Sequence, residues 1–288
     1  MQRRHLLLLA AAMPALARAE PPLRVVASFS ILADLVRVIG GPVVQVSSLV
    51  GPDADAHVYQ PSPADARRLA AAQLVVVNGL GFEGWLDRLV RASGFKGTLV
   101  TASRGITPRR MGREPDPHAW QDLGMVQRYV KTLTAALIDL RPDDRAVLQA
   151  RADAYLGQLQ AMDAGLRKRL DALPREHRRV VTSHDAFGYF GAAYGVDFLS
   201  AQGMSTDSEA SAAVIARLIQ QIRRQRVRAV FVENISDPRL IERIAREGGV
   251  RVGGRLYSDA LSAPGGPAAT FLQLFAHNAD AICTALGV

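Results

Sequence analysis

The sequence predicts an α/β fold of two lobes, each a mostly parallel sheet flanked by helices, joined by one long rigid helix. Three observations lead to this prediction. Short runs of Val and Leu without polar alternation, such as LVVV at 74–77, are typical of strands buried on both faces of a parallel sheet. Such runs alternate with helical patterns in both halves of the chain. Between the halves, residues 121–173 read as helix almost throughout.

The first half of the chain alternates between strands and helices from residue 23 onward. Its apolar runs predict strands at 23–28, 43–50, 74–79 and 97–103. The segments between them predict helices at 30–40, 63–72 and 82–93. Ser30 stands at the start of the first of these helices and is a candidate N-cap.

The middle of the chain predicts a linking helix at 143–173, bracketed by Pro142 and Pro174. Its large apolar residues recur at spacings of three, four or seven, which places them on one stripe of the helix. They are Leu148, Tyr155, Leu159, Met162, Leu166, Leu170 and Leu173. A stripe of this kind is more typical of a core contact than of a binding site.

In the second half the alternation returns, with strands predicted at 178–183, 196–200, 228–233 and 250–257 and helices at 208–224, 238–247 and 266–286. The chain is therefore expected to divide into an N-terminal α/β lobe at 20–140, the linking helix, and a C-terminal α/β lobe at 175–288. Ligands of open α/β sheets bind beyond the carboxyl ends of the strands, so the cleft between the lobes is the expected site.

Residues 1–19 have the pattern of a cleaved signal peptide. Arg3 and Arg4 precede a short apolar run, and Ala17-Arg18-Ala19 fits a small-x-small cleavage site. The apolar run is shorter than the roughly 20 residues that span a bilayer. Export through the Sec or the twin-arginine route is expected, because RRHLLL also suggests the latter.

Composition and cysteine usage narrow the class of protein. The chain is 49% apolar and 22% charged, as in a globular protein with a substantial core. Loss of three arginines with the signal peptide lowers the net charge from +8 to +5, and the basic residues are scattered among acidic ones, so no nucleic-acid partner is expected. Cys283 is the only cysteine, which predicts no internal disulfide and no lipid anchor at the cleavage point. The mature protein is expected to be free in the periplasm or secreted.

Three of the six histidines share one structural context. His57, His118 and His184 each follow a predicted strand or lie in a proline-marked turn, whereas His5 leaves with the signal and His177 and His277 fit solvated or packed positions. Each of the three, taken alone, reads as an ordinary loop histidine. Taken together, all three lie on the carboxyl side of a predicted α/β element, and Asp259 has the same position after the last predicted strand.

Three neutral imidazoles and one carboxylate would form a tetrahedral site for a divalent transition metal. That ligand set suits Zn²⁺ better than Mn²⁺, because nitrogen ligands favour the later metals. Asp55, Asp116 and Asp185 are near enough in sequence to orient the imidazoles, and the sequence does not assign which of them does so. The four ligands are far apart in sequence and form no local motif.

The chain resembles the metal-binding substrate-binding proteins of bacterial ABC importers for zinc and manganese, the group with a rigid helix between two lobes. The resemblance covers essentially the whole mature chain. It rests on the order and spacing of ASFSILADLVRVIGG, DAHVYQPSPAD, VVVNGLGFEGWLDRLV, DPHAWQD, TSHDAFGYFGAAYG, VFVENISDP and LYSDALS.

The resemblance implies four metal ligands, which fall on His57, His118, His184 and Asp259. A histidine at the third of these positions favours zinc, although some members with three histidines bind manganese. It further implies a monomer that hands the metal to an ABC permease powered by an ATPase. Many zinc members insert a histidine-rich loop between the first two ligands, and this chain has no histidine between His57 and His118.

Two other functions compete with metal import. A zinc hydrolase would need an open metal position and a general base, for which Glu233 is the only candidate. An adhesin or a metallochaperone with the same fold is the other alternative. The resemblance favours a non-enzymatic importer component that releases metal by motion of the loop around His57 or of residues 203–212.

Overall fold

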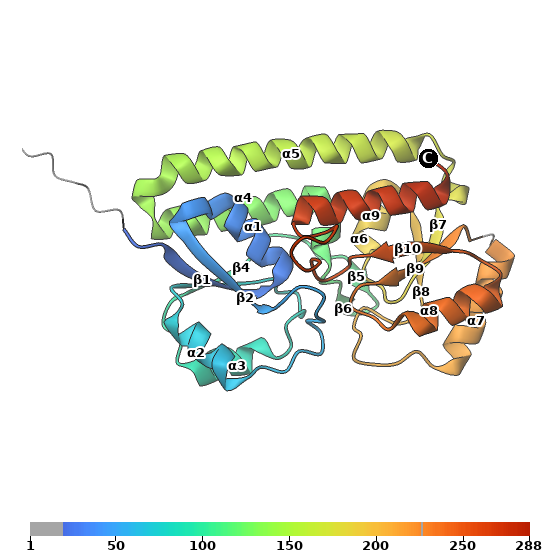
Figure 1. Ribbon diagram of the computed structural model, residues 1–288, viewed down its shortest axis with the longest axis horizontal. Coiled ribbons are helices and arrows are strands. Elements are labelled where there is room, and N and C mark those ends of the chain that lie inside the picture. The colour runs from blue at the N-terminus through green and yellow to red at the C-terminus, as the bar shows by residue number, and fades with distance from the viewer. Residues whose placement is uncertain (1–19, 226) are drawn as a thin grey trace, which may run out of the picture.

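A computed structural model describes residues 20–225 and 227–288 (Figure 1). The expected signal peptide at 1–19 lies outside these residues. In the described part of the chain, no helix combines the length and the apolar character needed to cross a bilayer.

The N-terminal sheet is fully parallel, with the strand order β2-β1-β3-β4. Every residue of β3 is buried, as expected for a strand covered on both faces. The strands are β1 (Leu23–Phe29), β2 (Val44–Val50), β3 (Leu74–Val77) and β4 (Thr98–Thr101), and the helices that connect them are α1 (Ser30–Gly40), α2 (Pro63–Ala71) and α3 (Leu86–Ser93).

The C-terminal sheet is also parallel, with the order β10-β9-β7-β8. A separate small apolar core lies between this sheet and two of its helices, α7 and α8. The strands are β7 (Arg179–Thr182), β8 (Asp197–Ser200), β9 (Ala229–Glu233) and β10 (Val252–Leu256), and the helices are α6 (Gly188–Tyr194), α7 (Ala212–Gln225) and α8 (Pro238–Gly248). The α/β class with two parallel sheets is therefore confirmed.

Three helices form a layer along one side of both sheets: α4 (Leu123–Leu140), α5 (Arg145–Asp171) and α9 (Phe271–Leu286) (Figure 1). The helix α5 has 27 residues and runs from one lobe to the other, which confirms the linking helix. Most of its predicted stripe is buried, and Met162 and Leu173 pack against the same core from half-buried positions. That core includes residues of both lobes, so it restrains motion of one sheet against the other. The lobe limits at residues 140 and 175 stay a prediction.

Some predicted element boundaries were wrong, because distant residues decide them. Ser30 is not an N-cap: the cap position is Phe29, and the Ser30 hydroxyl accepts a hydrogen bond from the Leu261 N–H at 3.0 Å. The helix expected at 82–93 begins only at Leu86, since Glu83 folds back and accepts bonds from backbone N–H groups after β3. The last helix begins at Phe271 rather than 266.

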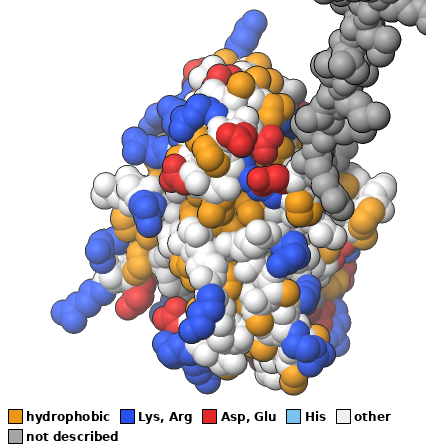
Figure 2. Space-filling view, turned by 90° about the vertical axis from the view of Figure 1, so that its left-hand side faces the viewer, with side chains coloured by type: hydrophobic (Ala, Val, Ile, Leu, Met, Phe, Trp, Pro, Cys, Tyr) orange, Lys and Arg blue, Asp and Glu red, His pale blue; other side chains and the backbone are white. Residues whose placement is uncertain are grey.

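Short elements complete the fold. An antiparallel hairpin precedes His118, and single turns of 3₁₀ helix connect longer elements. They are β5 (Arg110–Met111), β6 (Glu114–Pro115), η1 (Gly41–Val43), η2 (Ala119–Gln121), η3 (Pro142–Asp144) and η4 (Arg175–His177). On the end face shown in Figure 2, basic side chains are interspersed with acidic and apolar ones.

Candidate metal centre

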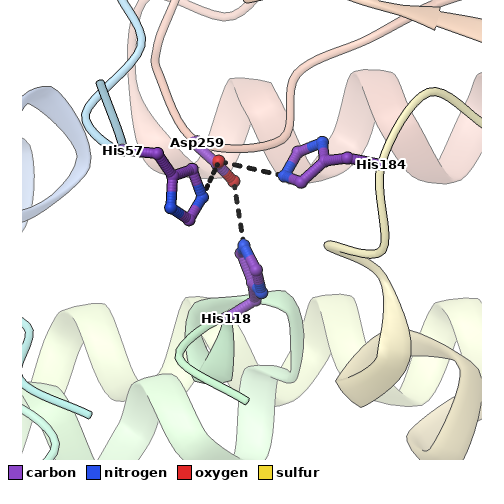
Figure 3. A group of neighbouring side chains, drawn as sticks. All are labelled: His57, His118, His184 and Asp259. Carbon is purple, nitrogen blue, oxygen red and sulfur yellow. Dashed lines mark hydrogen bonds and ion pairs between the residues drawn. The ribbon is translucent and has the colours of Figure 1, made fainter. Parts of the chain in front are cut away.

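The structure brings the four predicted ligands together between the two sheets (Figure 3). One nitrogen or oxygen atom from each of His57, His118, His184 and Asp259 lies within 4.8 Å of the others. His57 comes from the loop after β2, His184 follows β7, and Asp259 follows β10. His118 directly precedes η2. The site thus lies at the carboxyl ends of strands from both sheets, where this class of fold binds ligands.

The imidazole Nε2 atoms converge on the Asp259 carboxylate. The distances to its oxygens are 3.1 Å from His57, 3.2 Å from His184 and 3.8 Å from His118. Nε2 of His118 and Oδ1 of Asp259 are both buried and have no hydrogen-bond partner in the described chain. Buried polar atoms are normally satisfied, so two unpaired atoms that face each other indicate a place for a cation.

The imidazole of His118 is oriented by Asp116, one of the three aspartates considered from the sequence. Oδ1 of Asp116 lies 2.8 Å from Nδ1 of His118 and also accepts the His118 backbone N–H at 3.0 Å. A proton on Nδ1 leaves the Nε2 lone pair free to bind a metal. Nε of Arg109 lies 3.7 Å from the other oxygen of Asp116.

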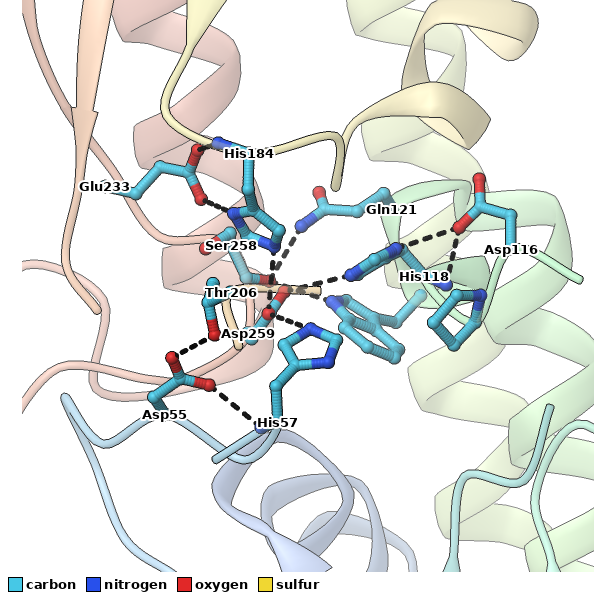
Figure 4. A network of polar contacts seen from close by, with 12 residues as sticks. Asp55, His57, Asp116, His118, Gln121, His184, Thr206, Glu233, Ser258 and Asp259 are labelled. Carbon is cyan, nitrogen blue, oxygen red and sulfur yellow. Dashed lines mark hydrogen bonds and ion pairs between the residues drawn. The ribbon is translucent and has the colours of Figure 1, made fainter. Parts of the chain in front are cut away.

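His184 is oriented by Glu233 at the end of β9 (Figure 4). Oε1 of Glu233 accepts the His184 backbone N–H at 2.9 Å, and Oε2 lies 2.5 Å from Nδ1. Both side chains are fully buried. Burial alone would lower the pKa of His184, but the negative charges of Glu233 and Asp259 outweigh it and raise this pKa well above its usual value. Both oxygens of Glu233 thus contact His184, so Glu233 is not free to act as the general base of a hydrolase.

Asp259 is held in place by contacts from the opposite lobe. The carbonyl of the preceding residue, Ser258, accepts hydrogen bonds from Trp120 Nε1 and Gln121 Nε2, both at 2.8 Å. Burial would raise the pKa of Asp259, but His184 and His118 outweigh this effect and hold it well below the usual value. The carboxylate therefore stays ionised inside the protein, as a metal ligand requires.

His57 is the ligand with the least burial, at 6% exposure of its side chain, whereas the other three side chains are at 0%. Its backbone N–H donates to Oδ1 of Asp55 at 2.8 Å, while Oδ2 of Asp55 accepts from the Thr206 hydroxyl of the other lobe at 2.5 Å. Among the described residues, neither Asp55 nor Asp185 forms a hydrogen bond to an imidazole. The roles of Thr206 and Ser258 were not predicted, and no local sequence pattern marks them.

Two parallel-sheet lobes, a long connecting helix and an inter-lobe centre of three histidines and one aspartate define a metal-binding substrate-binding protein of the ABC importer type. The comparison with protein families agrees with this class. The chain belongs to the family described as "Zinc-uptake complex component A periplasmic", whose model matches residues 25–285. Members of this family bind metals for transport, and the chain is not an enzyme.

Relatives with different named metals match almost the whole chain. The manganese-binding lipoprotein MntA of Halalkalibacterium halodurans is 32% identical, with 92% of this chain and 88% of that protein covered. The zinc-binding protein TroA of Treponema pallidum is 34% identical, with 91% and 88% covered. The iron-binding protein YfeA of Yersinia pestis is 31% identical, with 92% and 86% covered.

The solved structure of TroA from Treponema pallidum superimposes with a TM-score of 0.88 at 32% identity, and the match covers 92% of this chain and 99% of that chain. The fold and the metal-binding class are therefore shared. The relatives' names cover manganese, zinc and iron, so they do not single out one metal. MntA is also named a lipoprotein, in contrast to the expectation of no lipid anchor, which stays a prediction for this chain.

Proposed function

We propose that the protein captures Zn²⁺ in the periplasm with His57, His118, His184 and Asp259 and delivers it to an ABC permease driven by an ATPase. The observation that supports this most is the set of buried Nε2 and carboxylate atoms that converge without enough partners of their own. Three imidazoles and one carboxylate provide the four ligands that zinc prefers. In this proposal the mature protein acts as a monomer.

The cargo can be tested by competition between metals. Metal-free protein is offered equimolar Zn²⁺ and Mn²⁺, dialysed, and analysed for retained metal. We expect zinc to be retained in at least about tenfold excess, because nitrogen-rich sites bind zinc more tightly than manganese. The His57→Ala variant serves as the control for binding outside the site. Preferential retention of manganese would show that the fold is used for another cargo.

The affinity for zinc is expected to rise with pH through the histidine range and to keep rising above it. A histidine binds metal only when it is deprotonated. Because Glu233 and Asp259 outweigh burial and raise the pKa of His184 well above its usual value, zinc must displace a proton even at neutral pH. Titration calorimetry in buffers of different ionisation enthalpy measures the protons released. An affinity that is constant above the ordinary histidine pKa, with no proton release, would contradict this prediction.

A further inference from the structure

The contacts between the lobes differ on the two sides of the metal centre. On the His118 side they are buried: Trp120 and Gln121 both donate to the Ser258 carbonyl. The hydroxyl of Tyr189, on α6, donates to the Asp116 carbonyl at 3.2 Å and accepts from the Arg109 N–H at 3.0 Å. These bonds join the segments before and after His118 to the C-terminal lobe, so the centre is closed on this side.

On the His57 side the Asp53 side chain makes contacts with the C-terminal lobe that lie nearer the surface. Asp53 accepts bonds from the Asn234 side chain at 3.0 Å and from the Ala263 N–H at 3.1 Å, in exposed surroundings. The loop of His57 is itself fixed to the N-terminal lobe, because Trp85 Nε1 donates to the buried Ala56 carbonyl at 2.8 Å. Motion on this side is therefore expected in the opposing segment of the C-terminal lobe.

That opposing segment is residues 204–211, which form most of the connection between β8 and α7 and which we name the strap. It has no regular secondary structure, and most of its residues are exposed or half-buried. Among the hydrogen bonds of the described chain, one joins the strap to the N-terminal lobe, from the Thr206 hydroxyl to Asp55 (Figure 4). The same Asp55 carboxylate also accepts the backbone N–H of His57.

Two hollows in the surface are lined in part by the strap. One, of about 410 Å³, is lined by His57 and Phe82 together with Met204, Ser205 and Asp207 of the strap. The other, of about 580 Å³, is lined by Asp55 and Ser183 together with Thr206 and Glu209 of the strap. The strap thus lines both hollows, one of which also has a candidate metal ligand, His57, in its wall.

We propose that the Thr206–Asp55 hydrogen bond is a latch that holds the strap over His57, and that metal enters and leaves the centre on this side. The inference rests on the proposed function. Thr206 and Asp55 act as positioning residues: they touch no metal, but Asp55 fixes the backbone of His57 and the strap at once. When the bond breaks, the strap can move away and His57 becomes the ligand most open to water.

The test compares Thr206→Val, which keeps the shape of the side chain and removes the hydroxyl, with Thr206→Ser, which keeps the hydroxyl. Ser208→Ala removes an exposed hydroxyl from the same strap and is the matched control. The zinc-loaded full-length proteins are mixed with excess chromogenic chelator, and the rate of zinc transfer is followed. We expect about a tenfold faster loss of zinc from Thr206→Val, as for loss of one hydrogen bond to a charged group. Thr206→Ser and Ser208→Ala should stay within about twofold of the wild type.

Three further results separate the possible failures. In the background of Asp55→Asn, the Thr206→Val change should raise the rate by less than in the wild type, because the two residues act through one bond. Equal rates for wild type and Thr206→Val, or equally fast loss from Thr206→Ser, would overturn the latch while zinc binding stands. A wild-type protein that retains no metal would overturn the proposed function and the latch together. The unfolding temperature of the metal-free proteins shows whether Thr206→Val acts only through stability, which would also overturn the latch.

Discussion

The Asp259→Asn variant is expected to bind zinc about a hundred- to a thousandfold more weakly than the wild type. Four-ligand zinc sites contribute roughly 10–16 kcal/mol in total, and each factor of ten in affinity corresponds to about 1.4 kcal/mol. Asp259 is the only ligand with a negative charge, and all three imidazole Nε2 atoms point at its oxygens. Replacing this carboxylate by a neutral amide leaves the Zn²⁺ ion in a buried site with neutral ligands only. Competition with a chelator of known affinity measures the change.

The control for this variant is Asp87→Asn, which removes one carboxylate from an exposed position on α3. It should bind zinc as the wild type does. Circular dichroism of both metal-free variants establishes that the fold is retained. If Asp259→Asn folded and kept its zinc affinity within a factor of about three, Asp259 would not be a ligand, and the centre would have to lie elsewhere.

The fold was largely predictable because its strands carry a strong local signal. A run such as Leu74–Val77 has no polar face, and only a strand covered on both sides can bury it completely. The ends of the helices were less predictable. From the sequence, Glu83 is predicted to lie in a helix. In the structure its carboxylate accepts hydrogen bonds from the backbone N–H groups of Asn78 and Gly79, and the helix begins only at Leu86. Such competition depends on the folded path of the chain.

In the candidate site, too, contacts between residues close in sequence were easier to predict than contacts between residues far apart in sequence. Asp116 orients His118 from two residues away, so its proximity in sequence was informative. Asp55 is equally close to His57 but holds its backbone and bonds to Thr206, 151 residues away. Glu233 is 49 residues from His184 and was first considered as a catalytic base. Spacing identifies candidates for such contacts, and the tertiary structure assigns them.

The Glu233→Gln variant is expected to weaken zinc binding by about 10- to 100-fold, although the residue touches no metal. Zinc requires the lone pair of His184 Nε2, so the remaining proton must sit on Nδ1, where Oε2 of Glu233 lies 2.5 Å away. A glutamine can keep its oxygen on the His184 backbone N–H, but it then presents an N–H group to Nδ1. That donor favours the proton on Nε2, which is the tautomer that cannot bind zinc.

The tautomer provides a measurement that a merely structural role of Glu233 would not change. In ¹⁵N NMR spectra of the metal-free proteins, recorded at a pH at which His184 is neutral, the wild type should carry the His184 proton on Nδ1 and the Glu233→Gln variant should carry it on Nε2. Glu242→Gln, at an exposed position on α8, is the matched control and should leave both affinity and tautomer unchanged. Weaker zinc binding with the His184 proton still on Nδ1 would contradict this mechanism. The loss of zinc affinity would then be due to the missing negative charge of Glu233, since a carboxylate partner strengthens the imidazole as a donor to the metal.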